Sequence, residues 1–155
     1  MKLYHASPNQ NLKYIEPEKQ DTSNIDNVYE KKKEIYASND KSYAAGFCFN
    51  WSVERGFKFS CIDSIWEMKV PPKYIQRLKY PCSIYEVESK GFVNISDHEF
   101  ASTTKVKVIN EEKYYSCYDC LKQNGVRISI LKRKPFMDNA LIKKFRDIIQ
   151  KRKSE

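Results

Sequence analysis

The order of apolar and polar residues along the chain predicts many short strands. Several short segments alternate apolar and polar side chains, and a period of two is typical of a strand with one buried face. A polar stretch over residues 20–24 has the composition of a long loop. The predicted strands span residues 2–5, 34–38, 83–88, 92–95, 99–102, 106–109 and 126–131.

Helical patterns separate some of these strands. Asn39 can cap a helix that carries apolar residues through Phe49. A pair of prolines at 71 and 72 can begin a helix over residues 73–80, because proline at the first helical positions loses no hydrogen bond. Residues 111–123 predict a third helix, which Asn124-Gly125 would end, since glycine tolerates the left-handed conformation there.

The end of the chain predicts one more helix, over about residues 138–153. Asp138 can cap it. A stripe at helical spacing is typical of packing on a core. Its members are Leu141, Ile142, Phe145, Ile148 and Ile149.

Strands outnumber helices in this pattern and cluster in the middle of the chain. The fold class predicted is therefore α+β, with a mixed or antiparallel split sheet and flanking helices. The chain has 155 residues, no internal repeat and no linker-like tract, which predicts a single domain over residues 1–155.

Composition narrows the class of protein. Apolar residues make up 41% and charged residues 31%, a balance that favours a soluble folded protein. The sequence has no apolar run of about 18 residues and no charged-then-apolar leader, so we expect a cytoplasmic protein without a membrane partner. The five cysteines are odd in number and unevenly spaced, which fits reduced thiols. Cys117 and Cys120 have metal-ligand spacing, but no second such pair or nearby histidine completes a site, so we expect no metal.

The positive charge is concentrated at the end of the chain. The net charge is +8, and residues 132–155 carry nine basic and three acidic side chains, which is +6 of that total. Such a segment is either a solvated helix face or a surface for nucleic acid or an acidic partner, and the sequence leaves both open.

Three short segments have residue types suited to a binding site. They are Tyr4-His5-Ala6-Ser7, then Tyr36-Ala37-Ser38-Asn39-Asp40 with the helix after it, and finally residues 96–102, which include Asp97, His98 and Glu99. Each alone also fits ordinary structure, because a histidine at a strand end and a tyrosine within a strand are common in protein cores.

In this order, the three segments resemble ADP-ribosyltransferases of the diphtheria-toxin-like and poly-ADP-ribose-polymerase-like type, particularly small bacterial and phage members. The resemblance runs from Leu3 to about Ile109. It implies that NAD is a substrate and that ADP-ribose passes to a protein or nucleic-acid acceptor as nicotinamide leaves.

The resemblance also implies roles for residues of the first two segments. The backbone of the first segment, at Ala6 and Ser7, would grip the nicotinamide amide, and His5 would bond the adenosine-side ribose. Tyr36 would stack on the nicotinamide ring and Ser38 would line the same pocket. The family commonly has glycine where this chain has Ala6. Glycine has no Cβ, so the Cβ of Ala6 affects how closely the ligand can approach the backbone.

The third segment would supply the catalytic carboxylate, Glu99, which would stabilise the positive charge that develops as nicotinamide leaves. Asp97 lies two residues earlier, so on a strand it would face the same side and could orient the acceptor. His98 would then point to the other face, as a surface or core residue. Glu86 and Glu88 are rival carboxylates on the preceding predicted strand.

Two other functions remain open. An RNA 2′-phosphotransferase that uses NAD shares the fold, but its arginine and histidine set is not found in this sequence. The alternative from another class is a non-catalytic binding module, in which the basic helix over residues 138–153 holds nucleic acid or an acidic partner.

Overall fold

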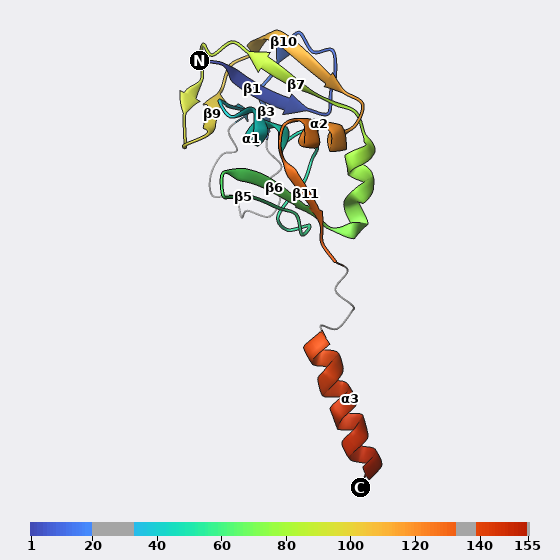
Figure 1. Cartoon of the computed structure of the whole chain (residues 1–155). Helices are drawn as coiled ribbons and strands as arrows, with labels where there is room; N and C mark the ends of the chain where they lie inside the picture. Colours follow the sequence, from blue (N-terminus) through green and yellow to red (C-terminus); the bar gives the residue numbers. More distant parts are fainter. Residues whose placement is uncertain (20–32, 133–138, 155) are drawn as a thin grey trace.

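The computed structural model describes residues 1–19, 33–132 and 139–154, and these form an α+β fold with mostly antiparallel sheets and a few helices (Figure 1). The larger sheet has the strand order β2-β10-β7-β1-β4-β9-β8, and β3 pairs with β4 beside it. Its strands are β1 (Leu3–Ser7), β2 (Tyr14–Ile15), β3 (Glu18–Lys19), β4 (Lys33–Ser38), β7 (Cys82–Val87), β8 (Val93–Asn94), β9 (Glu99–Ser102) and β10 (Val106–Tyr114).

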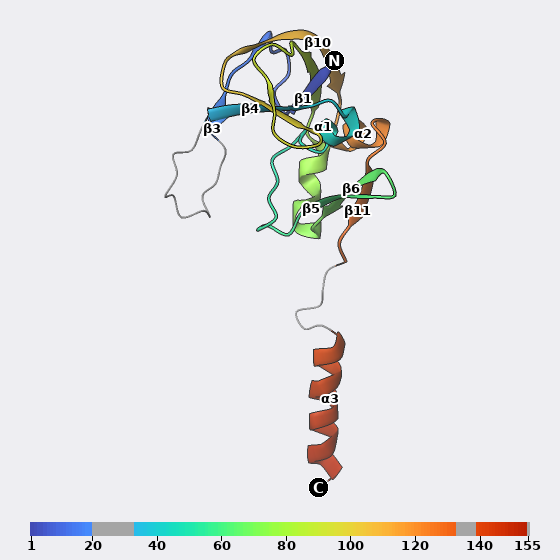
Figure 2. The ribbon, with the colours of Figure 1, turned by 90° about the vertical axis from the view of Figure 1, so that its left-hand side faces the viewer.

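A smaller sheet lies below the larger one in the view of Figure 1. It contains β5 (Lys58–Ile62), β6 (Ile65–Val70) and β11 (Arg127–Ile130), and β11 runs parallel to β6. The short helices α1 (Lys41–Ala45) and α2 (Cys117–Gln123) lie between the two sheets in both views (Figures 1 and 2). The predicted helix after the double proline is a 3-10 helix, η1 (Pro72–Lys79).

The larger sheet separates two apolar clusters. Because neighbouring residues of a strand project to opposite faces, Ile84 and Tyr85 of β7 belong to different clusters. The cluster that contains Ile84 also takes Met68 of β6 and Leu121 of α2, and so joins the two sheets. The sheets and the helices between them therefore share one packed core.

The helix predicted over residues 111–123 is wrong in its first part. β10 continues to Tyr114, and Glu111 lies opposite Tyr85 of β7, where its carboxylate accepts a hydrogen bond of 2.6 Å from Ser83. The helix begins at Cys117, where the Ser116 side chain caps it. Strand pairing and these polar contacts override the helical preference of the local sequence.

The helix α1 is shorter than predicted and is capped by a different residue. Asp40, not Asn39, accepts hydrogen bonds from the backbone N–H groups of Ser42 and Tyr43, at 2.9 and 3.3 Å. The helix ends at Gly46, where the backbone lies against the ring of Phe59, so that a Cβ at this position would lie only 2.3 Å from a ring carbon.

We expect the variant Asp40→Ala to lower the free energy of unfolding by about 1–2 kcal/mol, because it removes the helix cap. The other carboxylate oxygen of Asp40 accepts a 3.0 Å bond from Trp66 Nε1, so the same change loosens the smaller sheet. Urea unfolding measures the loss. The control is Asn39→Ala at the neighbouring exposed position, expected to cost about 0.5 kcal/mol or less. Equal losses in the two variants would contradict the assignment of the cap.

The last helix, α3 (Asn139–Ser154), lies away from the two sheets in both views (Figures 1 and 2). The prediction that its apolar stripe packs on the core is wrong for Ile148 and Ile149, which are each 51% exposed. The side chains of Leu141, Ile142 and Phe145, and the predicted cap Asp138, lie outside the described residues. Helical spacing shows that one face is apolar, but it does not say what covers that face.

Candidate functional site

Three neighbouring strands bring the three sequence segments together. The strand β4 lies between β1 and β9, and Ser38 of β4 is directly opposite both Tyr4 and Glu99. Tyr36 and Ser38 are two residues apart, so they project from the same face, and Glu99 shares that face because it lies opposite Ser38. The candidate catalytic carboxylate and two candidate nicotinamide contacts therefore lie side by side.

His5 lies where β1 and β4 separate. The described register between these two strands consists of one pair, Tyr4 with Ser38, whereas β1 remains paired with β7 through Ser7. In the interval beyond Tyr4, Nδ1 of His5 lies 2.7 Å from the carbonyl oxygen of Tyr36. The imidazole thus connects the first segment to the second at the point where the sheet begins to split.

The other predicted contacts of this region have structural partners. The Ser7 hydroxyl accepts a 3.1 Å hydrogen bond from the backbone N–H of Asn9, and the Ser38 hydroxyl accepts one of 3.0 Å from Asp40. Ala6 is buried and lies opposite Ile84 of β7. The two serines shape the turns after their strands, and Ala6 contributes its side chain to the core.

Tyr36 is half-buried and keeps its proton. Its hydroxyl donates a 2.6 Å hydrogen bond to the Glu34 carboxylate. Burial, followed by this hydrogen bond and the charges of Glu34 and Glu99, raises the pKa of Tyr36 to about 12 from its ordinary value of 10.0. At neutral pH the site therefore contains an uncharged aromatic ring close to the Glu99 carboxylate.

The raised pKa of Tyr36 predicts a loss of stability in alkali. Because the folded protein binds this proton more tightly, the stabilisation is fully present below pH 10 and is lost as the pH rises towards about 12. The ionisation of Tyr36 is measured as the tyrosinate absorbance of the wild type minus that of the variant Tyr36→Phe. We expect this difference to rise near pH 12. The titration curve of a free tyrosine, centred at the ordinary value of 10.0, provides the reference. A Tyr36 difference curve that coincides with this reference would contradict the prediction.

Glu99 also has a partner from α1. The Tyr43 hydroxyl donates a hydrogen bond to a carboxylate oxygen of Glu99. Burial, and then this hydrogen bond, raise the pKa of Tyr43 well above its usual value. Tyr43 therefore stays protonated and fixes one oxygen of the carboxylate, while the second oxygen accepts no hydrogen bond from the described part of the chain.

Aromatic rings from the smaller sheet surround this pair. The ring of Trp66 lies 4.9 Å from that of Tyr43, and Phe59 stacks on Trp66 at 4.9 Å. Trp66 is itself held by its hydrogen bond to Asp40 at the start of α1. The carboxylate of Glu99 is thus half-buried beside apolar rings, a setting in which electrostatic interactions are stronger than in water.

The structure corrects the expectations for Asp97 and His98. Asp97 lies in the turn between β8 and β9, where the backbone N–H groups of Ile95 and Ser96 bond to the carbonyl of Glu99, and it is exposed. It is not on a strand, because β9 begins at Glu99, and strand alternation therefore does not place it beside that carboxylate. His98 is exposed, as expected for a surface residue, but it does not point away from the site, since its ring lies 5.9 Å from that of Tyr43.

The rival carboxylates lie elsewhere. Glu86 is on β7, two strands from β4, and its carboxylate pairs with the Lys2 ammonium at 3.5 Å. Glu88 is exposed just beyond the end of β7. Neither Glu86 nor Glu88 lies opposite Ser38, whereas Glu99 does, so Glu99 is the stronger candidate of the three.

A small hollow of about 100 Å³ opens on the larger sheet near Tyr4, but it is not the candidate site. Its volume is below the roughly 300–1,000 Å³ of typical small-molecule sites. Its lining residues are Lys2, Tyr4, Lys41, Ile84, Glu86, Asn110 and Glu112, so it includes neither His5, Tyr36 nor Glu99. The Lys41–Glu112 ion pair, at 2.6 Å, accounts for much of its polar character.

Sequence reasoning assigned no role to Tyr43 or Trp66. Tyr43 belonged to a helical pattern in which an aromatic residue is ordinarily core, and Trp66 lies on a strand that was not predicted.

No helix in the described ranges is long and apolar enough to cross a membrane. The chain matched no protein-family model, no curated protein and no solved structure.

Proposed function

We propose that this protein transfers ADP-ribose from NAD to a protein or nucleic-acid acceptor and releases nicotinamide. The observation that carries the proposal is the convergence of Tyr36, Ser38 and Glu99 with the His5 segment on β1, β4 and β9. These residues lie far apart in the sequence, in three segments that each resemble part of the same enzyme family. Adjacent strands make them neighbours, as a common ligand would require.

Glu99 would act on the nicotinamide ribose of NAD. In the reaction, the bond from the anomeric carbon to the nicotinamide nitrogen breaks, and nicotinamide leaves with the bonding electrons. The acceptor nucleophile then bonds to that carbon and gives its proton to solvent. The Glu99 carboxylate would accept a hydrogen bond from the ribose 2′-hydroxyl and stabilise the positive charge of the transition state.

The residues around Glu99 would hold the ligand. The Tyr36 ring would stack on the positively charged nicotinamide ring, a contact worth roughly 0.5–2 kcal/mol. The backbone at Ala6 would bond the carboxamide, and His5 would bond the adenosine-side ribose. Because the methyl group of Ala6 is buried in the core, the backbone at this position would make the contact despite the absence of glycine.

The test uses NAD labelled in the adenylate part and, separately, in nicotinamide. The protein is incubated with each label and a cell extract, and modified protein is resolved from modified nucleic acid. We expect label from the adenylate part to enter one class of macromolecule as free nicotinamide appears. Free nicotinamide with no labelled macromolecule would instead indicate a glycohydrolase. No binding of NAD by calorimetry and no release of nicotinamide would overturn the proposal.

The exposed basic helix α3 favours a second candidate function, a non-catalytic module for nucleic acid. Lys143, Lys144 and Arg146 of α3 are exposed, and the helix lies away from both sheets (Figure 1). Binding through these residues would weaken steeply as salt rises, because phosphate contacts release counterions. Replacing the three by glutamine should reduce that salt dependence. An interaction insensitive to salt would exclude this function.

A further inference from the structure

Four of the five cysteines lie together in the core although they come from separate segments. Cys48 follows α1, Cys82 begins β7, and Cys117 and Cys120 are on α2. All four are 0% exposed, whereas Cys61 of β5 is exposed. The fold therefore gives the Cys117–Cys120 pair the second pair of thiols that the sequence alone does not reveal.

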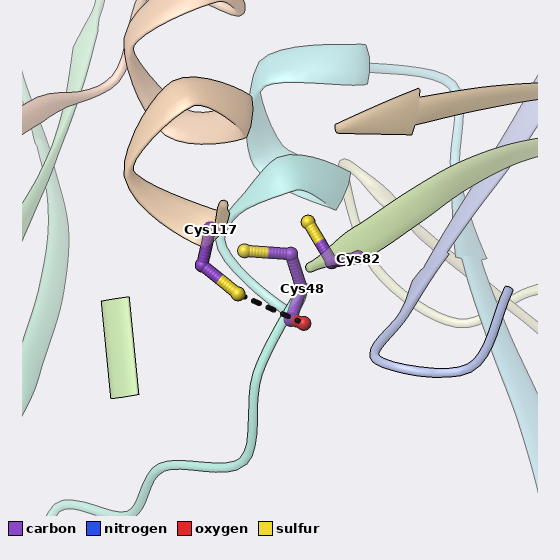
Figure 3. A group of neighbouring side chains, drawn as sticks. All are labelled: Cys48, Cys82 and Cys117. Atoms are coloured by element: carbon purple, nitrogen blue, oxygen red, sulfur yellow. Dashed lines mark hydrogen bonds between the residues drawn. The ribbon is translucent and has the colours of Figure 1, made fainter. Parts of the chain in front are cut away.

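The sulfur atoms are close enough to share one metal ion. The Sγ atoms of Cys48, Cys82 and Cys117 all lie within 4.8 Å of one another (Figure 3). In a tetrahedral zinc site with Zn–S bonds of about 2.3 Å, the sulfur atoms are about 3.8 Å apart. Shifts of about 1 Å or less in side-chain position would bring these three thiols to that spacing.

Cys120 is the candidate for a fourth ligand, although its sulfur is not among the three that all lie within 4.8 Å of one another. It is three residues after Cys117 on α2, so the two side chains lie on the same face of the helix. Its side chain is 0% exposed and belongs to the same buried cluster as Cys48, Cys82 and Cys117. The group therefore has the number and type of ligands found in closed structural zinc sites.

We propose that Cys48, Cys82, Cys117 and Cys120 hold a structural Zn²⁺ ion in tetrahedral coordination. Thiolate sulfur selects soft or borderline metals such as zinc over magnesium or calcium. On binding, the thiols lose their protons to solvent, and the bond that Cys117 donates to the Cys48 carbonyl, at 3.6 Å, is replaced by a bond to the metal. The proposal does not depend on the reaction proposed above.

The site would join three parts of the fold. Cys48 is three residues after the end of α1, Cys82 is at the start of β7 in the larger sheet, and the other two ligands are on α2. A metal bound in the folded state but not in the unfolded chain stabilises the fold, and a site of this kind would fix α1 and α2 against the sheet.

The experiment uses the whole chain, expressed in zinc-containing medium and purified with a reductant but without a chelator. We expect one zinc ion per folded chain. Replacement by Co²⁺ should give the intense thiolate charge-transfer absorption and visible bands of a tetrahedral cobalt site. The variants Cys48→Ser and Cys120→Ser should lose the metal or bind it far more weakly, whereas Cys61→Ser should keep it.

A second measurement covers the case in which the cluster variants do not fold. Removing zinc from the wild type with a strong chelator should lower its unfolding midpoint, and added Zn²⁺ should restore it. The proposal is overturned if the folded wild type contains no metal and neither Zn²⁺ nor Co²⁺ changes its midpoint or spectrum. A disulfide among the four cysteines in protein purified under reducing conditions would overturn it as well.

Discussion

The variant Glu99→Gln is expected to lower the rate of nicotinamide release from NAD by about 100-fold or more. The amide keeps the size of the side chain but removes its negative charge, which would stabilise the positive charge on the ribose in the transition state. NAD affinity should change little, because the Tyr36 ring and the backbone at Ala6 remain. The measurement is nicotinamide release under single-turnover conditions, with the affinity for NAD obtained by calorimetry.

The matched control is Glu86→Gln. Glu86 is also a half-buried carboxylate on the larger sheet, but it pairs with Lys2 and lies two strands from Ser38. The variant Glu86→Gln should leave the rate of nicotinamide release nearly unchanged. If both variants were equally active, or if Glu86→Gln were the inactive one, Glu99 would not be the catalytic residue. A loss of NAD binding in Glu99→Gln without loss of rate at saturation would likewise argue against this role.

The variant Phe57→Ala is expected to lower the free energy of unfolding by about 3–5 kcal/mol. Phe57 is 1% exposed, just before β5, and its ring lies 5.8 Å from Phe49 and 5.3 Å from Tyr74. Alanine would leave a cavity among these rings, because the surrounding elements can relax only in part. Since small domains have about 5–15 kcal/mol of stability in total, the loss would be a large share of it.

Urea unfolding measures this cost. Phe57→Leu, which retains most of the side-chain volume, should cost about 1.5 kcal/mol or less and keeps the measurement possible if the alanine variant does not fold. The control is Phe47→Ala, whose ring is 41% exposed and should contribute much less. If Phe57→Ala costs no more than Phe47→Ala, Phe57 does not have the central place in the core that its burial indicates.

The larger sheet was the most predictable part of the fold. Residues 34–38, 83–88 and 99–102 were each predicted as a strand, and each range overlaps an observed one, β4, β7 and β9 respectively. These strands have apolar clusters on both faces of the sheet, and short segments with β-branched or aromatic residues still identify such strands. The prediction of an α+β fold is confirmed at that level.

The hairpin of β5 and β6 was not predicted. Its turn consists of Asp63 and Ser64, both with positive φ, at 51° and 65°. Such turns are usually recognised by glycine, which adopts positive φ without strain, and this turn has none. As a result, the sequence did not indicate the strand that brings Trp66 to the candidate site.

Long-range contacts explain what else was missed in the candidate site. The bond from Tyr43 to Glu99 joins residues 56 positions apart, and the cysteine cluster joins α2 to residues near 48 and 82. Neither follows from local pattern, because local pattern determines which face of an element is apolar but not which elements meet. The order of the three segments could be identified from the sequence. The contacts between them depend on which strands pair in the sheet, and the sequence did not indicate that pairing.

The contact between Gly46 and Phe59 has a consequence for sequence variation. At position 46 even a methyl group would meet the Phe59 ring, so the identities of these two positions are linked through the space they share. In any set of homologous chains, we expect residues larger than glycine at 46 to occur with a smaller side chain at 59. A lineage that changes position 59 first would then be free to vary position 46, whereas the opposite order would pass through a less stable intermediate.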